Sequence, residues 1–154
     1  MLCRHWAHVQ TTRSRAFLCC PPQLINNFIG QAITTATAEG LATAAKTGLD
    51  TRALFRVLSS GSVNNLMMSF MIEPMLNAHG DEKLAGLKFS LSNAMKDLRA
   101  YTHLTETLCL PSTMGEAVHQ SLVTANCLGL GDKYIASLIT AQEKLTGVKI
   151  VPKD

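Results

Sequence analysis

Apolar residues recur at helical spacing through the first half of the chain. Between Gln23 and Thr47 there is no proline, and one side collects Leu24, Phe28, Ala32, Ala36, Ala38, Leu41, Ala42 and Ala45. This pattern predicts a single helix on the order of 36 Å long. Pro21-Pro22 can occupy its start, where missing N–H groups cost nothing. Gly48 is expected to end it.

Turn-forming residues divide the next stretch into two shorter helices. Asp50 is expected to cap a helix that continues to about residue 59 and is closed by Gly61. A methionine-rich helix is predicted around Val63–Ile72, ending at Pro74 because proline cannot donate the helical hydrogen bond.

The second half shows the same alternation of predicted helices and turn-forming residues. Residues 79–86 contain two glycines and a charged run, which is typical of a loop. A fourth helix is predicted from about Ser90 to Cys109. Thr113 and Glu116 have the spacing of a capping box, which predicts a fifth helix continuing to about Leu128.

One more helix completes the prediction. Gly129-Leu130-Gly131 breaks the fifth helix, and Asp132 can cap a last one over roughly residues 133–145. No segment shows a convincing period-two alternation bounded by turn pairs. The sequence therefore predicts an all-α fold, a bundle of about five to six helices with a long first helix.

Composition supports a folded chain. The 154 residues are 47% hydrophobic and 16% charged, which excludes wholesale disorder. This length suits one domain that buries about two-thirds of its unfolded surface. No run of about 18 uninterrupted apolar residues predicts a transmembrane helix.

The net charge of +3 lies entirely in the leader, residues 1–22. Arg4, Arg13 and Arg15 stand there without an acidic residue, whereas residues 24–154 carry 11 basic and 11 acidic side chains. We therefore expect neither a nucleic-acid nor a membrane partner. Three origins of the leader stay open: an organelle-targeting peptide, a misassigned start or reading frame, and a genuine extension. It is expected to be disordered, and the protein cytoplasmic, or mitochondrial if the leader is a targeting peptide.

No cluster of side chains predicts a metal site or a catalytic centre by itself. The histidines (His5, His8, His79, His103, His119) lie far apart, and Cys19-Cys20 is neither a metal-binding nor a redox motif. Cys109 and Cys127 lie on predicted apolar faces and are expected to be buried. The methionines Met67, Met68, Met71 and Met75 favour adaptable core or interface packing over a ligand set.

Two polar pairs stand in otherwise apolar helices. Asn26-Asn27 lies in the first half of the long helix, where asparagine has poor helix propensity. Lys96-Asp97 lies between Met95 and Leu98 of the fourth helix. Each pair can be solvated or self-satisfied, or can offer hydrogen bonds to a ligand.

Four segments, in order, carry a resemblance to a known family. Gln23–Asn27 is similar to the Lys-x-x-Asn-Asn motif of the β-hydroxyacid dehydrogenases, which include 3-hydroxyisobutyrate dehydrogenase and 2-hydroxy-3-oxopropionate reductase. The stretches AEGLATAAKTGLDTRALFRVLSSGS, FSLSNAMKDLRAY and LCLPSTMGEAVHQSLVTANCLGLGDKYIASLI resemble the family's following segments. The resemblance covers about residues 23–150 and leaves 151–154 as a tail.

The resemblance implies a helical C-terminal domain, like that of the related 6-phosphogluconate dehydrogenase, which binds substrate and forms a homo-oligomer. In the family, a separate Rossmann domain binds NAD or NADP, and the substrate is a small 3-hydroxy acid. By the resemblance, Asn27 binds substrate, Lys96 contacts the cofactor, and Asp97 accompanies Lys96.

The chain departs from the family at the position of the catalytic lysine, where Gln23 stands. A neutral amide has no proton to exchange near pH 7, and loss of an acid/base group typically costs 10²–10⁴ in rate. The residues that match also lack the Rossmann half. The chain alone is therefore expected to be inactive and to bind no cofactor tightly. The alternative is a non-catalytic oligomerisation or binding module that acts through its methionine-rich surface.

Overall fold

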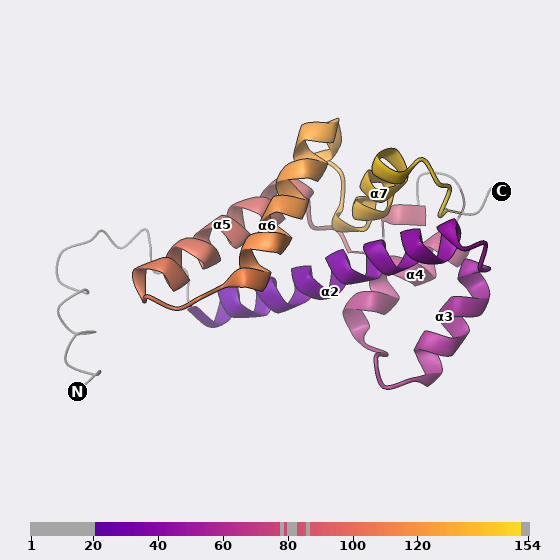
Figure 1. Ribbon diagram of the computed structural model, residues 1–154, viewed down its shortest axis with the longest axis horizontal. Coiled ribbons are helices and arrows are strands. Elements are labelled where there is room, and N and C mark those ends of the chain that lie inside the picture. Colours follow the sequence, from indigo (N-terminus) through magenta and orange to yellow (C-terminus); the bar gives the residue numbers. More distant parts are fainter. Residues whose placement is uncertain (1–20, 78, 80–82, 86, 152–154) are drawn as a thin grey trace.

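The computed structural model describes residues 21–77, 79, 83–85 and 87–151, which fold around one long helix. This helix, α2 (Pro21–Lys46), has 26 residues and is about 39 Å long. It runs the length of the molecule and contacts all five other α-helices (Figure 1). The predicted first helix is confirmed, with Lys46 in its last turn and Gly48 following at φ 79°.

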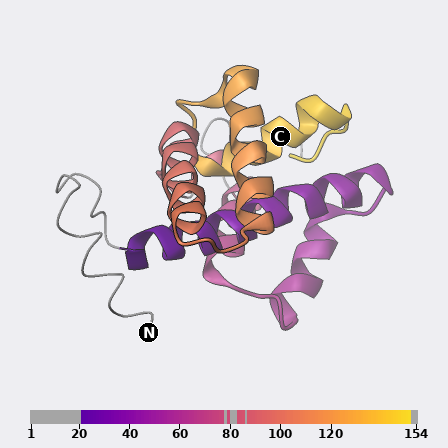
Figure 2. The same cartoon turned by 60° about the vertical axis from the view of Figure 1, so that its left-hand side comes forward.

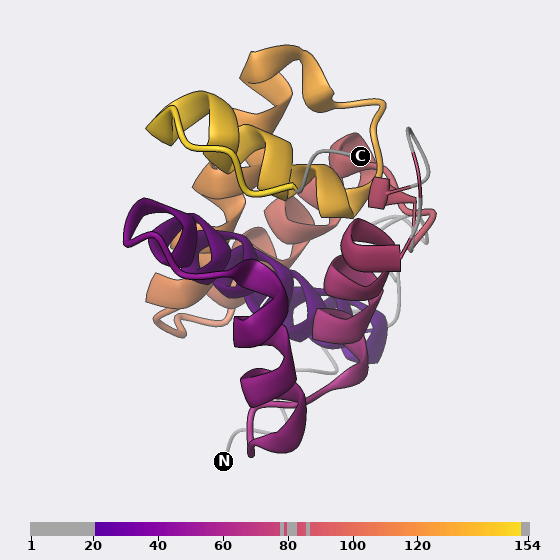
Figure 3. The same ribbon diagram turned by 90° about the vertical axis from the view of Figure 1, so that its right-hand side faces the viewer.

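The other helices lie on two sides of α2. Helices α3 (Thr51–Ser60) and α4 (Leu66–Asn77) lie on one side. On the other side lie α5 (Leu91–Thr107), α6 (Thr113–Ala125) and α7 (Leu138–Thr146), as Figures 2 and 3 show from two further directions. The all-α prediction is confirmed, because the only sheet-like pairing among the described residues is a single bridge between Ser90 and Tyr134.

The core forms where these helices meet. Its large, fully buried side chains come from α2 and from both sides of it: Leu41, Met71, Ile72, Met75, Leu91, Leu98, Leu122, Ile135 and Ile139. Met68 is also buried, so most of the methionine-rich segment is core. The prediction that these methionines serve core packing is confirmed, whereas the methionine-rich surface on which the alternative function depended is contradicted by the burial of Met68, Met71 and Met75. None of the helices in the described ranges is long and apolar enough to cross a membrane.

Local capping signals were correct around α3. Asp50 accepts a hydrogen bond from the backbone N–H of Arg52 at 2.9 Å, and Gly61 closes the helix. The predicted end of the next helix was wrong, because α4 continues through Pro74 to Asn77. An internal proline costs about 3 kcal/mol. The buried side chains of Ile72 and Met75 on either side of Pro74 supply the compensating packing.

The start of α6 also differs from its prediction. Ser112, not Thr113, is the capping position, and its side chain makes no capping hydrogen bond. The backbone N–H of Glu116 bonds to the Ser112 carbonyl at 2.9 Å, so the helix begins one residue earlier than the capping-box spacing indicates. The predicted capping box is therefore wrong.

The break after α6 is confirmed, but the start of the last helix is not. Residues 126–130 form a π-helical turn with Gly129 at φ 78°. Asp132 caps no helix, because the next residues hydrogen-bond to the segment that leads into α5: Lys133 O accepts from Leu91 N, and Ile135 N donates to Phe89 O, both at 2.9 Å. A short 3₁₀ turn, η4 (Ile135–Ser137), then leads into α7.

Both described cysteines are exposed, which contradicts the expectation that they are buried. Cys109 follows the end of α5 and has φ 54°, a left-handed backbone turn that takes it away from the apolar face of the helix. Cys127 lies in the π-helical turn, where the wider turn rotates the following side chains relative to α-helical spacing. Cys3, Cys19 and Cys20 lie outside the described residues.

Candidate functional site

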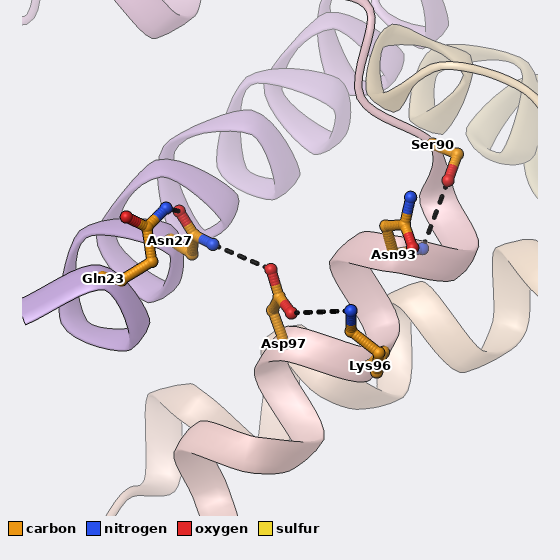
Figure 4. A network of polar contacts seen from close by, with 6 residues as sticks. All are labelled: Gln23, Asn27, Ser90, Asn93, Lys96 and Asp97. Atoms are coloured by element: carbon orange, nitrogen blue, oxygen red, sulfur yellow. Dashed lines mark hydrogen bonds and ion pairs between the residues drawn. The ribbon is translucent and has the colours of Figure 1, made fainter. Parts of the chain in front are cut away.

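The two polar pairs singled out in the sequence meet in the structure. Asn27 on α2 and Asp97 on α5 are 70 positions apart, and Asn27 Nδ2 donates a hydrogen bond to Asp97 Oδ2 at 2.8 Å (Figure 4). Asn27 is half-buried, and the Asp97 side chain is 20% exposed. A short, partly desolvated hydrogen bond to a carboxylate is stronger than one between neutral groups. This contact therefore joins the two helices at a defined point.

Gln23 lies one helical turn before Asn27. Its Nε2 donates to Asn27 Oδ1 at 3.4 Å, and Asn26 Nδ2 donates to the same oxygen at the same distance. Both contacts are long for hydrogen bonds and solvent-exposed, so they hold the amide only weakly. Gln23 is nevertheless part of the cluster.

Lys96 reaches the cluster from the solvent side. Its Nζ lies 3.6 Å from Asp97 Oδ1, while 73% of its side chain is exposed. An ion pair this exposed contributes at most about 1 kcal/mol. The ammonium group can therefore turn to another anion at little cost. One carboxylate oxygen of Asp97 therefore accepts a hydrogen bond from Asn27, and the other forms the ion pair with Lys96.

Aromatic packing next to the cluster sets the spacing of the two helices. The rings of Phe28 and Tyr101 stack with centroids 4.3 Å apart and planes 7° from parallel. Phe28 follows Asn27 in α2, and Tyr101 lies one turn after Asp97 in α5. On α6, a side chain at Gly115 would bring its Cβ to 3.0 Å from the Tyr101 ring. The polar contact therefore lies beside a tightly packed joint of three helices.

The chemistry of this cluster is binding rather than proton transfer. It offers amide N–H groups, one carboxylate and one mobile ammonium group, which suit hydrogen bonding and charge pairing with a small anion. Gln23 brings no titratable group to the position of the family's lysine. Among the described residues, no group of three histidines, cysteines or acids could hold a metal ion.

The remaining candidates do not join this cluster. His103 Nδ1 lies 3.5 Å from Glu106 Oε2 on the outer face of α5. His79 and His119 belong to other segments, and His5 and His8 lie outside the described residues. One residue of the same α2 face was missed by the sequence reading. Gln31 is 3% exposed and its Oε1 accepts from Thr34 Oγ1 at 3.3 Å.

Gln31 could have been found from its spacing. Gln23, Asn27 and Gln31 follow one another at four-residue intervals, which puts three amides along one stripe of a helix. Exposure falls along this stripe, from the exposed Gln23 through the half-buried Asn27 to the buried Gln31. The stripe therefore leads from solvent into the domain.

Comparison with known proteins agrees with this architecture. Residues 23–141 match the family model described as "NAD-binding of NADP-dependent 3-hydroxyisobutyrate dehydrogenase", and the chain belongs to this family. The matched range holds every member of the cluster. The family is thus one of NAD-binding oxidoreductases, and the resemblance seen in the sequence is confirmed.

Among solved structures, the chain is similar to 3-hydroxyisobutyrate dehydrogenase from Salmonella typhimurium, with a TM-score of 0.67 and 17% identity. The similarity covers 77% of this chain and 40% of the Salmonella chain, and at this identity it shows a shared fold. This chain therefore corresponds to less than half of that dehydrogenase. No curated protein matches the sequence.

Proposed function

We propose that residues 23–150 are the substrate-binding, α-helical domain of an NAD(P)-dependent 3-hydroxy acid dehydrogenase. The observation that carries this proposal is the Asn27–Asp97–Lys96 cluster, which joins two segments of the matched family across α2 and α5. In this proposal Asn27 binds the substrate and Lys96 contacts the cofactor. Pro21 and Pro22, which the sequence assigned to the leader, belong to α2; the proposed leader is therefore the stretch before them, and 151–154 is the proposed tail.

Binding of the substrate by this chain can be tested directly. Titration with 3-hydroxyisobutyrate at millimolar concentration should shift the NMR signals of Asn27 and Lys96, because both offer donors to an anion. Asn27→Ala should abolish the response, whereas Asn77→Ala, an exposed asparagine at the end of α4, should preserve it. No response in the unaltered chain, or an undiminished response in Asn27→Ala, would contradict the proposal.

Gln23 supports a further element of the proposal: the 154-residue chain does not turn over substrate by itself. The side chain at this position donates to Asn27 but cannot carry a proton between substrate and solvent near neutral pH. Purified chain with NAD or NADP and 3-hydroxyisobutyrate should give no change in absorbance of the reduced cofactor. Turnover at ordinary dehydrogenase rates, on the order of 1–10³ s⁻¹, would refute this expectation.

A second candidate function is homo-oligomerisation, favoured by apolar side chains at the outer end of α2. Ile25 and Ile29 are 46% and 51% exposed and lie one turn apart, beside the polar stripe. A second copy of the chain could cover them. Light scattering after size exclusion should then give a dimer mass that falls to a monomer mass in the Ile25→Ser/Ile29→Ser variant. A monomer at all concentrations would exclude this candidate.

A further inference from the structure

The polar cluster fixes which way the Asn27 amide points. An ionised carboxylate has no proton to donate, so it can only accept. Because Asp97 Oδ2 lies 2.8 Å from the Asn27 amide, the group facing it must be Nδ2, and the amide oxygen must point away. The chemistry of Asp97 therefore determines the orientation of the Asn27 amide, even though the nitrogen and oxygen of an amide are otherwise hard to tell apart.

The oxygen of Asn27 is engaged within its own helix. Asn27 Oδ1 accepts from Gln23 Nε2 and from Asn26 Nδ2, both at 3.4 Å. One hydrogen of Nδ2 is given to Asp97. The group of Asn27 that no contact of the cluster uses is therefore the second hydrogen of Nδ2.

We propose that Asp97 is a positioning residue, which holds Asn27 so that it presents an N–H donor, and not its carbonyl, to a ligand oxygen. This inference rests on the proposed function, in which Asn27 meets the ligand. It adds the chemical sense of that contact: the ligand atom at Asn27 is an acceptor, a carboxylate or hydroxyl oxygen of a small hydroxy acid. A ligand group that can only donate is not accepted there.

The contacts around Asp97 separate this role from simple packing and from charge pairing. The Phe28–Tyr101 stack also holds α2 against α5, so the hydrogen bond is not the only contact between these two helices. The ion pair with Lys96 is longer, at 3.6 Å, and mostly solvated. On α2, Asp97 contacts the neutral amide of Asn27. Asp97 therefore orients this amide, which neither the aromatic stack nor the ion pair with Lys96 does.

The first test observes the Asn27 side-chain amide by NMR in the full chain. In Asp97→Ala the Asn27 Nδ2 hydrogens should change chemical shift and exchange faster with water, because they lose the carboxylate that accepts from them at 2.8 Å. In Asp132→Ala, a matched loss of an exposed carboxylate, they should not change. Asn27 amide signals that are the same in Asp97→Ala as in the unaltered chain overturn the proposal.

The second test uses the opposite signs that charge and orientation predict. Removing the negative charge of Asp97 would, by electrostatics alone, strengthen binding of 3-hydroxyisobutyrate. If Asp97 positions Asn27, Asp97→Ala should weaken that binding several-fold, because Asn27 Nδ2 loses its acceptor. Asp97→Asn should retain part of the binding, because its amide oxygen can still accept from Asn27. Tighter or unchanged binding by Asp97→Ala overturns the proposal. Absence of binding by the unaltered chain refutes the proposed function, and the Asn27 amide signals then decide the orientation alone.

Discussion

Replacing Gly131 by alanine should destabilise the fold through a single crowded point. The backbone at Gly131 has φ −53° and ψ −40°, which any residue adopts, so conformation does not require glycine. Space does require it. An added Cβ would lie 2.6 Å from both Ser92 Oγ and Asn126 Oδ1, the donor and acceptor of one hydrogen bond.

The size of the effect follows from the bonds that must yield. Ser92 Oγ donates to Asn126 Oδ1 at 2.9 Å, and Asn126 Nδ2 donates to Leu122 O at 2.8 Å. Moving the Asn126 side chain away from the new methyl group disturbs both, at about 0.5–1.5 kcal/mol each. We therefore expect Gly131→Ala to lower the free energy of unfolding by about 1–3 kcal/mol.

Urea denaturation followed by circular dichroism at the helix band measures this change. Gly40→Ala is the matched control, because Gly40 lies within α2 and its Cβ would meet nothing within 4 Å. It should stabilise the protein by about 0.5–1 kcal/mol, since alanine favours helix over glycine. In the Ser92→Ala background, Gly131→Ala should cost less, because one of the two crowding atoms is gone. Equal effects at positions 131 and 40, or strict additivity with Ser92→Ala, would refute the reasoning.

Three further substitutions test other parts of the fold, the first two by the same denaturation assay and the third by amide exchange. Phe28→Leu should lower the free energy of unfolding by about 0.5–1.5 kcal/mol through loss of stacking on Tyr101. The loss should be smaller in a Tyr101→Leu background, and equal losses in the two backgrounds would show that the stack contributes nothing. Ile72→Ala should cost about 2–5 kcal/mol because Ile72 is fully buried, and a cost below 1 kcal/mol would contradict that burial. Glu143→Ala should release the end of the chain, because Glu143 Oε1 accepts from the backbone N–H of Ile150 at 2.7 Å; faster amide exchange at Ile150 is the expected readout, and unchanged exchange would contradict this role.

Features set by neighbouring residues were predictable from the sequence. Gly48 ends α2 and Asp50 caps α3 because each effect acts within a few residues of the chain. The all-α architecture followed from spacing in the same way. Pro74 shows the limit, since its local preference to end a helix is outweighed by buried side chains on both sides, and those contacts come from elsewhere in the fold.

The same distinction between local and long-range effects applies to the candidate site. Asn27 and Lys96 could be proposed from local motifs and from the resemblance to a family. The hydrogen bond between Asn27 and Asp97 joins residues 70 positions apart, and no local pattern in the sequence predicts it. The sequence suggested Lys96 as the companion of Asp97, whereas the structure shows that Asn27 is the closer of its two partners.

The uneven burial of α2 separates folding from chemistry along a single helix. Its middle carries core residues such as Leu41, while its first turn, with Pro21, Pro22 and Gln23 at the surface, contributes little to the core. A substitution at position 23 can therefore change what the site does without endangering the fold that holds it. A glutamine where the family has lysine is the kind of change that such an arrangement tolerates, and the helix that bears it remains anchored at its other end.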